Sequence, residues 1–277
     1  MIRLASRVSG LWFAGVLCSL VLAGCAQRAI SLPTGTGEPL PDFAAIHAEV
    51  SKSCAAVRTL TAELALSGRA AGQKVRGRAL AGFQAPDAMR LEGLAPFGAP
   101  AFILVTSGRE ATLLLPRDHR VLRDAGAEEI LGALTGVSLG PADLQAILTG
   151  CAVPAPKAVN GAQYGADWRS IELQDGATIY LRRVRGTWQL RAAVRGPWHI
   201  EYAEWQGAFP RSVRLVHTPS SSTSARQGVD IRAEISQLET NVALGTGTFT
   251  VDVPGDAIAI TLDELHDAGP LRGTSSR

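Results

Sequence analysis

The sequence has no excess of charge of either sign, which argues against one large class of partners. Its 277 residues include 27 Lys and Arg and 25 Asp and Glu. Two of the arginines, Arg3 and Arg7, lie in the first 24 residues, so residues 25–277 carry 25 basic and 25 acidic side chains. A neutral chain lacks the basic footprint of a nucleic-acid-binding protein and any polybasic attraction to anionic lipid. We therefore expect no nucleic-acid partner.

Motifs for catalysis and for metal binding are also lacking. The five histidines share no metal-ligand spacing, and the sequence contains no HExxH and no glycine-rich phosphate loop. Residues 136–140 fit the pattern G-x-S-x-G, but a nucleophile elbow needs a strand before its serine, and a helical pattern precedes Ser138. Pro141 follows at a position that is typical of the first turn of a helix. We predict that the protein is not an enzyme and that it holds no metal and no cofactor.

The apolar run over Leu11–Leu22 is too short to span a bilayer. Arg3 and Arg7 precede it, an order that is typical of a secretory signal. The run ends in Leu-Ala-Gly-Cys, which resembles a bacterial lipobox, whose cysteine is acylated and becomes the new N-terminus. The alternative is an ordinary signal followed by a chance cysteine. We predict that residues 1–24 are a lipoprotein signal peptide and that Cys25 is the lipidation site.

An acylated Cys25 would anchor the protein to a membrane without crossing it. Several acyl chains on one residue suffice for stable anchoring, because each buried methylene contributes about 0.8 kcal/mol. Residues 25–40 are rich in Gly, Pro and Thr and are predicted to form a flexible tether. Ala26 follows the cysteine, which by the sorting rule of bacterial lipoproteins indicates the periplasm-facing side of the outer membrane.

Cysteine is scarce beyond the anchor, with only Cys54 and Cys151 remaining. An exported compartment is oxidising, and no CxxC or nearby Cys/His grouping indicates redox or metal chemistry. Two explanations are open, a disulfide across 97 residues or two buried free thiols. We predict the disulfide, which in the chain-entropy model contributes about 4–5 kcal/mol to stability.

The pattern of apolar residues predicts one helix followed by many strands. Apolar side chains from Phe43 to Leu60 recur every three or four residues, which predicts a helix over residues 42–59 with Cys54 on its buried face. Beyond Leu60 the period changes to two, and short alternating runs are separated by turns with Gly or Pro. Two short helical stretches, residues 127–134 and 141–148, interrupt the strands.

These patterns predict a mainly β fold (α+β): a strongly curved antiparallel half-barrel of about 10–11 strands, because so many strands in one sheet curl. The N-terminal helix and a short two-helix lid would cover the concave side. One domain over residues 41–262 is expected, followed by a disordered tail over residues 263–277. Alternation alone leaves open whether the concave side is a filled core or a cavity.

Two stretches carry a resemblance to a known family. Residues 130–150 read ILGALTGVSLGPADLQAILTG, with Leu134-Thr135-Gly136 and Leu148-Thr149-Gly150 at the ends of the two helical stretches. Together with the lipobox and the early strands, this segment resembles LolB, the outer-membrane lipoprotein receptor. Residues 241–254, NVALGTGTFTVDVP, are similar to the closing strands of the wider LolA/LolB-like superfamily. The Cys54/Cys151 pair and the extension past Pro254 depart from that pattern and indicate a diverged member.

The resemblance implies a site for acyl chains. In this family a helical lid closes a hydrophobic cavity that receives the acyl chains of lipoproteins or lipids, which a periplasmic carrier protein delivers. The cavity and lid residues would be Leu131, Leu134, Leu144, Ile147 and Leu148. The resemblance carries no sign of an oligomer, and a monomer is expected.

The loop GLAPFGAP, residues 93–100, is apolar although loops normally face water. In LolB-like receptors a protruding apolar residue in a Pro-Leu-Gly turn serves delivery to the membrane, and Pro96-Phe97-Gly98 stands at that place. The resemblance thus implies a membrane-contact loop of Leu94, Pro96 and Phe97. The alternative is that Leu94 and Phe97 fold back over the edge of the core.

The leading hypothesis is therefore a membrane-anchored lipoprotein that binds acyl chains in a hydrophobic cavity and receives or inserts lipoproteins or lipid at the outer membrane. The alternative is a non-enzymatic structural or assembly lipoprotein that uses the half-barrel as a protein-interaction surface. A large apolar pocket under residues 127–150 favours the carrier, and a filled interior favours the scaffold.

Overall fold

The computed structural model describes residues 30–70, 72–135, 138–152, 156–218 and 228–268. The chain divides into two units, residues 1–31 and residues 32–277, and the second is compact by itself. The predicted signal peptide, Cys25 and the first part of the tether lie outside the described residues, as do residues 269–277 of the predicted tail. The fold below is that of the second unit.

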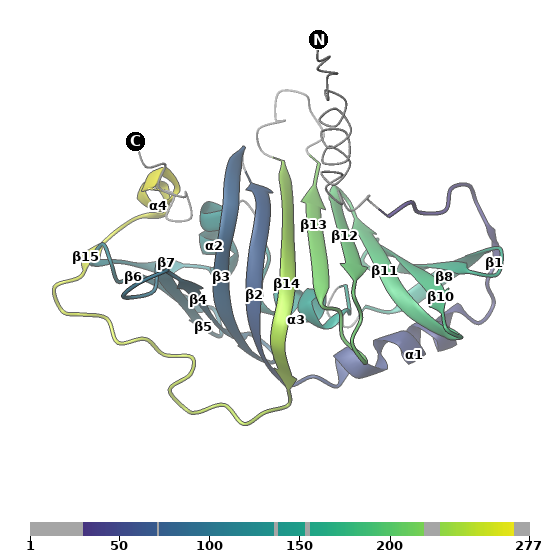
Figure 1. Cartoon of the computed structure of the whole chain (residues 1–277), viewed down its shortest axis with the longest axis horizontal. Helices are drawn as coiled ribbons and strands as arrows, with labels where there is room; N and C mark the ends of the chain where they lie inside the picture. Colours follow the sequence, from purple (N-terminus) through teal and green to yellow (C-terminus); the bar gives the residue numbers. More distant parts are fainter. Residues whose placement is uncertain (1–29, 71, 136–137, 153–155, 219–227, 269–277) are drawn as a thin grey trace, which may run out of the picture. The chain divides into compact units, whose positions relative to one another are not determined.

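Fifteen strands of the described residues form one sheet, built from two antiparallel meanders (Figure 1). The first meander contains β2 (Thr59–Ala70), β3 (Gln73–Gln84), β4 (Ala88–Leu94), β5 (Phe102–Ser107), β6 (Glu110–Leu115) and β7 (Arg120–Ala125). The second contains β8 (Ala158–Tyr164), β9 (Trp168–Leu173), β10 (Thr178–Val184), β11 (Thr187–Arg195), β12 (Trp198–Ala203), β13 (Ser212–His217) and β14 (Val229–Thr240). The last strand of the second meander, β14, pairs with the first strand of the first, β2. This one pairing makes two meanders into a single sheet.

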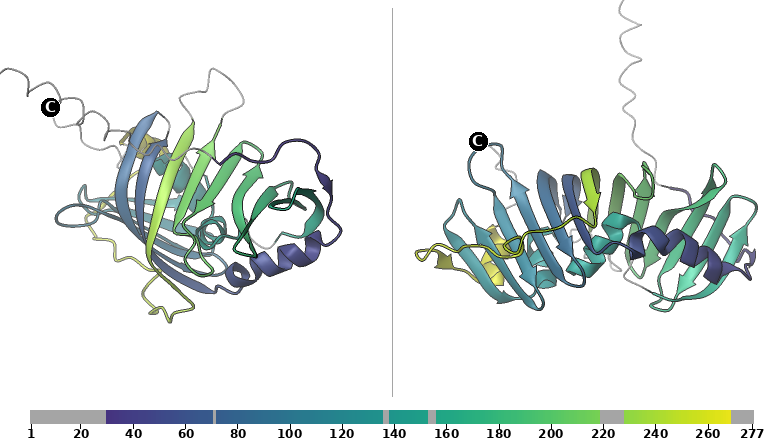
Figure 2. Two further views of the ribbon diagram at one scale, coloured as in Figure 1. Left: turned by 45° about the vertical axis from the view of Figure 1, so that its right-hand side comes forward. Right: turned by 90° about the horizontal axis from the view of Figure 1, so that it is seen from below.

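The sheet is strongly curved and unclosed, as the half-barrel prediction required, and helices lie in its hollow (Figure 2). The helices are α1 (Phe43–Ala55), α2 (Ala127–Thr135), α3 (Pro141–Thr149) and α4 (Leu262–Ala268). Alternation along the strands sets the two faces: β4, for example, alternates half-buried with buried residues along its whole length. The buried side chains of the strands and of α1, α2 and α3 form one continuous core on the concave side.

The sheet has more strands than the 10–11 predicted, for identifiable reasons. Two strands at the edges, β1 (Glu38–Pro39) and β15 (Ile258–Ala259), are only two residues long and leave no alternation to read. The strand β8, AVNGAQY, has little apolar alternation because Asn160 and Gly161 interrupt it. Gly161 is needed there, since a Cβ at this position would lie 2.5 Å from the Cβ of Phe43 on α1.

The domain is longer at both ends than residues 41–262. At its start, β1 pairs with β8, and Leu40 is buried. At its end, β15 pairs in parallel with β7, and α4 buries Leu265 completely. Both short strands cover a sheet edge that would otherwise present unpaired backbone groups. The first residues of the predicted tail are therefore helical and packed.

The predicted helix over residues 42–59 ends earlier, at Ala55. Val57 and Leu60 continue the helical spacing and are buried, but Val57 lies in the turn and Leu60 in β2. An apolar residue satisfies a helix pattern and a strand pattern equally well when the two elements meet, which is why the sequence placed the boundary too late.

The two predicted lid helices are confirmed as α2 and α3. Pro141 stands in the first turn of α3, and Gly150 ends it in a left-handed conformation with φ of 83°. A Cβ at Gly150 would also lie 2.7 Å from the ring of Trp205, so glycine is required twice over. The helix α2 precedes Ser138, as the argument against a nucleophile elbow required, while Gly136 and Val137 lie outside the described residues.

Residues 241–257, which resemble closing strands in sequence, contain no strand. They form a strap between β14 and β15 that crosses the outer face of the first meander. Arg90 points outward from β4 and its Nη1 donates to the carbonyl oxygens of Thr248 and Thr250, at 3.2 and 2.8 Å. The strap therefore covers part of the outer face of the first meander and adds no strand to the sheet.

Candidate functional site

The predicted lid side chains converge on the concave side of the sheet. Leu131 and Leu134 on α2 and Ile147 and Leu148 on α3 are buried in the common core, and Leu144 is half-buried against it. Their partners in that core are apolar strand side chains such as Leu104 and Leu113. The lid residues therefore belong to the same buried core as the strands.

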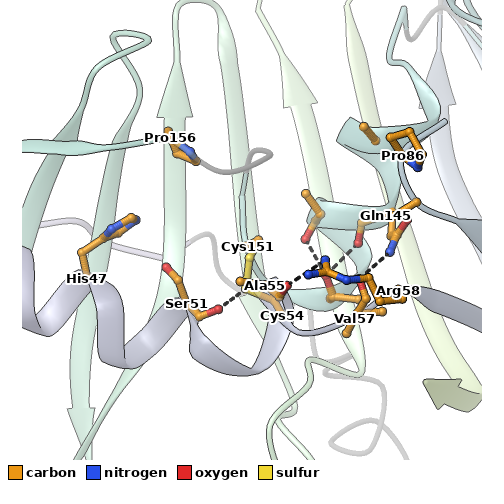
Figure 3. A pocket seen from close by; sticks show the side chains of 14 residues that line it. His47, Ser51, Cys54, Ala55, Val57, Arg58, Pro86, Gln145, Cys151 and Pro156 are labelled. Carbon is orange, nitrogen blue, oxygen red and sulfur yellow. Dashed lines mark hydrogen bonds between the residues drawn. A yellow bond between two sulfur atoms is a disulfide. The ribbon is translucent and has the colours of Figure 1, made fainter. Parts of the chain in front are cut away.

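A pocket of about 300 Å³ opens beside the lid, between α1, α3 and the turn before β4 (Figure 3). Its wall is mainly apolar, and burial lowers the pKa of His47, so this imidazole is neutral at neutral pH. Two polar side chains of the wall are engaged within the protein: Gln145 Nε2 donates to Val57 O at 3.2 Å and Thr149 Oγ1 to Gln145 O at 2.8 Å. The wall consists of His47, Ser51, Cys54, Ala55, Val57, Arg58, Ala85, Pro86, Ala142, Gln145, Ala146, Thr149, Cys151 and Pro156.

The predicted disulfide between Cys54 and Cys151 is present and lies in the wall of this pocket. Its Cα atoms are 5.6 Å apart, within the usual range for a disulfide. The bond ties the end of α1 to the residue after Gly150, so that α3 is held at its C-terminal end. The 97-residue loop that it closes contains the whole first meander and both lid helices.

The apolar loop after β4 presents Phe97 to solvent. The Phe97 side chain is 87% exposed and Pro96 is exposed, whereas Leu94 is half-buried at the end of β4. Ala101 N donates to Gly93 O at 2.8 Å, which closes the base of the loop. The alternative in which Phe97 folds back over the core is therefore wrong for Phe97, and only Leu94 reaches toward the sheet.

Gly93 and Gly98 explain how the loop projects. A Cβ at Gly93 would lie 2.3 Å from the ring of Phe102, so the two strands can approach only with glycine there. Gly98 has φ of +75°, a conformation that other residues adopt at a cost. The loop follows the end of β4, whereas the turn that lines the pocket precedes the start of β4. The seven extended residues of β4 separate the loop from this turn by about 20 Å.

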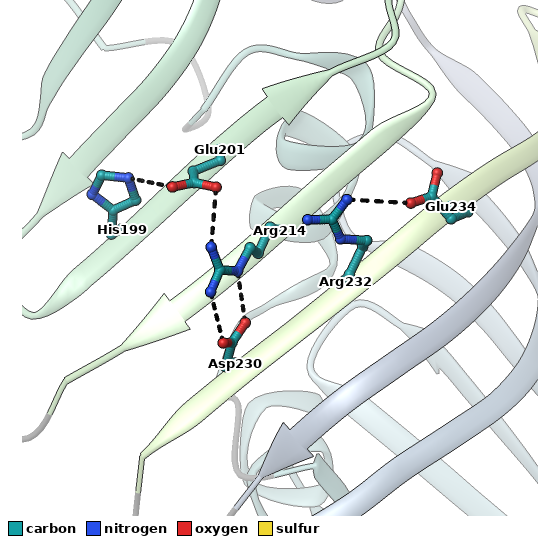
Figure 4. Close-up of polar contacts among 6 residues, drawn as sticks. All are labelled: His199, Glu201, Arg214, Asp230, Arg232 and Glu234. Atoms are coloured by element: carbon teal, nitrogen blue, oxygen red, sulfur yellow. Dashed lines mark hydrogen bonds and ion pairs between the residues drawn. The ribbon is translucent and has the colours of Figure 1, made fainter. Parts of the chain in front are cut away.

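The outer face of the second meander carries a network of charged side chains (Figure 4). Arg214 on β13 donates from Nε and Nη2 to both carboxylate oxygens of Asp230, at 2.8 and 2.7 Å, and its Nη1 lies 3.4 Å from Glu201. His199 lies 3.4 Å from Glu201, and Arg232 pairs with Glu234 at 3.8 Å. These hydrogen bonds from Arg214 lower the pKa of Asp230. The acidic and basic side chains of this network pair with one another, so we interpret the network as a structural feature of the sheet.

Two properties of the described residues bear on other functions. No group of three or more His, Cys, Asp or Glu side chains among them could hold a metal ion. Within the same residues, no helix is both long and apolar enough to cross a membrane.

Comparison with known proteins identifies likenesses of fold only. No protein-family model and no curated protein sequence matches the chain. The fold is similar to that of a solved LolA superfamily protein. This structure, from Nitrosomonas europaea, is 9% identical, with 73% of the chain and 96% of that protein covered and a TM-score of 0.46.

Two further structures show a similar course of the backbone. A DUF1329 family protein from Desulfovibrio piger is 11% identical over 76% of the chain and 97% of its own length, with a TM-score of 0.48. The lipoprotein LppX from Mycobacterium tuberculosis is 11% identical over 77% and 99%, with a TM-score of 0.31.

Sequence reasoning did not identify the pocket beside α1 and α3. The pair Cys54 and Cys151 was the available signal, because a disulfide brings the segments on either side of it together. The other wall residues come from the turn before β4 and from α3, and only the packing of the helices on the sheet places them there.

Proposed function

We propose that this chain is a lipid-anchored envelope protein that binds acyl chains on the concave side of its half-barrel and touches the bilayer through the loop of Leu94, Pro96 and Phe97. Cys25 is the proposed lipid anchor. The proposed cargo is the acyl chain of a lipoprotein or lipid, received from a periplasmic carrier protein and passed to the outer membrane by a monomer. No catalytic step is part of this function.

The observation that carries the proposal is the chemistry between the lid and the sheet. The side chains that α2 and α3 bury there are mainly aliphatic, with Ile130, Leu131 and Leu134 on α2. An acyl chain can replace such contacts without leaving a hydrogen-bonding group unpaired, which is the main cost of disrupting a buried contact. An acyl chain could not replace the contacts of a polar lid in this way, because buried polar groups would lose their hydrogen-bond partners.

The two lid helices are held differently, which indicates the part that moves. The disulfide and the hydrogen bond from Gln145 to Val57 fix α3 against α1. The helix α2 contacts β6 and α4 and buries aliphatic side chains. We therefore assign the displacement by an incoming acyl chain to α2, with the pocket beside α3 as its entrance.

The experiment is the binding of a fluorescent fatty acid to residues 26–277, made without the signal and the acylated cysteine. Saturable binding, displaced by unlabelled fatty acid, is expected, together with lipid that co-purifies with the protein. A protein that binds no probe and purifies without lipid would contradict the proposal.

The scaffold alternative has one observation in its favour, because the lid side chains are buried in one core with the strands. If the half-barrel serves as an interaction surface, a protein partner will co-purify at a fixed stoichiometry and the fatty acid will not bind. Probe binding with no protein partner excludes this alternative.

A further inference from the structure

Five arginines gather at one end of the strands β9, β10 and β11. Arg169 is near the start of β9, Arg182 and Arg183 end β10, Arg185 lies in the next turn, and Arg191 is on β11. In the sheet register, Arg182 lies opposite Trp168 and Arg183 opposite Trp188. Because successive side chains of a strand point to opposite faces, Arg169, Arg183 and Trp188 share the face of the buried Leu181, and Arg182 and Trp168 share the other face. We call these five arginines and two tryptophans the arginine–tryptophan cluster.

The tryptophans hold the guanidinium groups by their ring faces. The Arg169 Cζ lies 4.7 Å from the ring centroid of Trp188, and that of Arg183 lies 5.9 Å from the same ring. The Arg182 Cζ lies 5.7 Å from the ring centroid of Trp168. Stacking of this kind orients a guanidinium without using the N–H groups at its edge. In Arg169 one of these groups is already engaged, because Nη1 donates to the carbonyl oxygens of Gly165 and Trp168, at 2.9 and 2.8 Å.

Within the described part of the chain, none of the five arginines forms an ion pair with a carboxylate. The Nε atoms of Arg169 and Arg191 are buried without a hydrogen-bond partner there. Burial, and then the positive charge of Arg182, lower the pKa of Arg191. Asp167 contributes one negative charge in the preceding turn, against five positive ones.

Some other arginines of the same sheet have a carboxylate partner. Arg214 pairs with Asp230, Arg232 with Glu234, and Arg78 with Glu63. The stacking of three arginines on two tryptophan rings is what distinguishes the end of β9, β10 and β11. The neutral total charge of the chain conceals this local excess of arginine.

We propose that the part of the arginine–tryptophan cluster on the concave face, Arg169 and Arg183 over Trp188, binds the phosphate group of a lipid headgroup. This rests on the proposed function and names the class of lipid that the half-barrel takes. Guanidinium groups bind phosphate through two parallel hydrogen bonds, and a phosphate accepts from more than one arginine at once. The half-buried tryptophans are the residues that suit a lipid interface, where a polar and an apolar phase meet.

The position of the cluster favours a lipid over a soluble phosphate. All neighbouring strands from β10 to β3 are antiparallel, and the number of steps between them is even, so the ends of β10 and β3 lie at the same edge of the sheet. The turn after β3 lines the pocket, and the cluster surrounds the turn after β10. A headgroup at the cluster and an acyl chain entering the pocket thus use one edge, opposite the edge that carries Phe97.

The test compares two short-chain ligands that differ only in the headgroup. Residues 26–277, which contain the compact unit from Leu32 onward, are titrated with dihexanoyl-phosphatidylglycerol and with dihexanoylglycerol, which has the same acyl chains and no phosphate. Calorimetry gives the affinity, and the tryptophan fluorescence, to which Trp168 and Trp188 contribute together with Trp198 and Trp205, reports on the cluster. We expect tighter binding of the phosphate-bearing lipid, with a change in tryptophan emission that the phosphate-free lipid does not cause.

The variant is the triple substitution Arg182→Gln, Arg183→Gln and Arg185→Gln, which removes the three exposed guanidinium groups. It should weaken phosphatidylglycerol binding by about tenfold or more, the usual effect of lost hydrogen bonds to a charged group. Dihexanoylglycerol binding should stay unchanged. The matched control removes three exposed arginines elsewhere, Arg69→Gln, Arg76→Gln and Arg117→Gln, and should leave both affinities unchanged. Circular dichroism and thermal unfolding confirm that both variants fold.

The outcomes separate this inference from the function on which it rests. Equal binding of the two lipids, or an equal loss in the control variant, would overturn the inference and leave acyl binding intact. Inositol hexakisphosphate or polyglutamate binding as tightly as phosphatidylglycerol would overturn the assignment to a lipid. If neither short-chain lipid binds, the proposed function fails with it.

Discussion

The two meanders share one architecture but present different chemistry at their ends. The first, β2–β7, carries an apolar loop with an exposed Phe97 between β4 and β5, and α2 packs against its strand β6. The second, β8–β14, carries arginines stacked on tryptophans around the turn between β10 and β11, and α1 packs against it. Strand alternation builds both halves of the one half-barrel in the same way, so the difference in function has to come from the turns and the covering helices.

The helices over the two meanders also differ in how they are held. A disulfide fixes the end of α1 to the end of α3, whereas α2 is packed through aliphatic side chains. A covalent link and an apolar contact respond differently to an apolar ligand, because only the contact can be exchanged for it. The comparison therefore predicts a fixed half and an adaptable half.

The largest effect is expected from the disulfide, which encloses the first meander in its loop. Replacing both cysteines, Cys54→Ala and Cys151→Ala, should lower the free energy of unfolding by about 4–5 kcal/mol in the chain-entropy model. Urea unfolding of the variant and the oxidised parent measures the difference. A loss below about 1 kcal/mol would show that the first meander does not depend on this closure.

The next effect separates the two lid helices. Leu134→Ala on α2 and Leu148→Ala on α3 each remove a buried leucine and should each cost about 2–4 kcal/mol of stability. Only Leu134→Ala should tighten fatty-acid binding, because the acyl chain then displaces less of the protein's own packing. Equal affinities in the two variants would contradict the assignment of movement to α2.

A smaller effect concerns the charged network on the second meander. The hydrogen bonds from Arg214 lower the pKa of Asp230 below its usual value of 3.8. A lowered carboxyl pKa stabilises the fold above the unfolded value, and this contribution is lost as the pH falls through the folded value. Asp230→Asn should therefore cost about 0.5–1 kcal/mol at neutral pH, since half of the Asp230 side chain is exposed.

The pH profile checks this sign. The difference in unfolding free energy between the parent and Asp230→Asn should be constant above about pH 5 and shrink as the pH falls below about 4. A difference that grows on acidification would mean that the Arg214–Asp230 pair does not stabilise the native state.

The smallest effect on stability is expected at Phe97, which contacts little. Phe97→Glu should change the free energy of unfolding by no more than about 0.5 kcal/mol, as is usual for exposed positions. It should nevertheless weaken binding to phospholipid vesicles, because a carboxylate does not enter an apolar phase. Leu80→Glu, on the outer face of β3, replaces another exposed apolar residue and serves as the control. Unfolding of Phe97→Glu would show that the loop is part of the core.

Much of the fold could be predicted from local patterns. Alternation revealed the strands of both meanders except β8, and the helical spacing and glycine positions revealed α2 and α3. The disulfide followed from cysteine scarcity in an exported chain. The strands β1 and β15 could not be predicted because they are too short to show a period. The end of α1 was misplaced because Val57 and Leu60 fit both the helical and the strand period.

The site was less accessible to sequence reasoning. Phe97 could be found because an uncharged loop is unusual, and its exposure then required the structure. The arginine–tryptophan cluster could not be found, because its residues come from three strands and only their register brings them together. The neutral total charge even led us to expect no basic site for anionic lipid, because a sum over the chain does not show where the charged residues lie.

The central claim is that an acyl chain takes the place of α2 side chains on the concave side of the sheet. A fatty acid with a photoreactive group along its chain, bound and irradiated, tests this directly when the labelled residues are mapped by mass spectrometry. The account predicts labels on concave residues beneath α2, such as Leu104 and Leu113, and on Leu131 and Leu134 themselves. Labels confined to the outer face of the sheet, or no specific label, would contradict it.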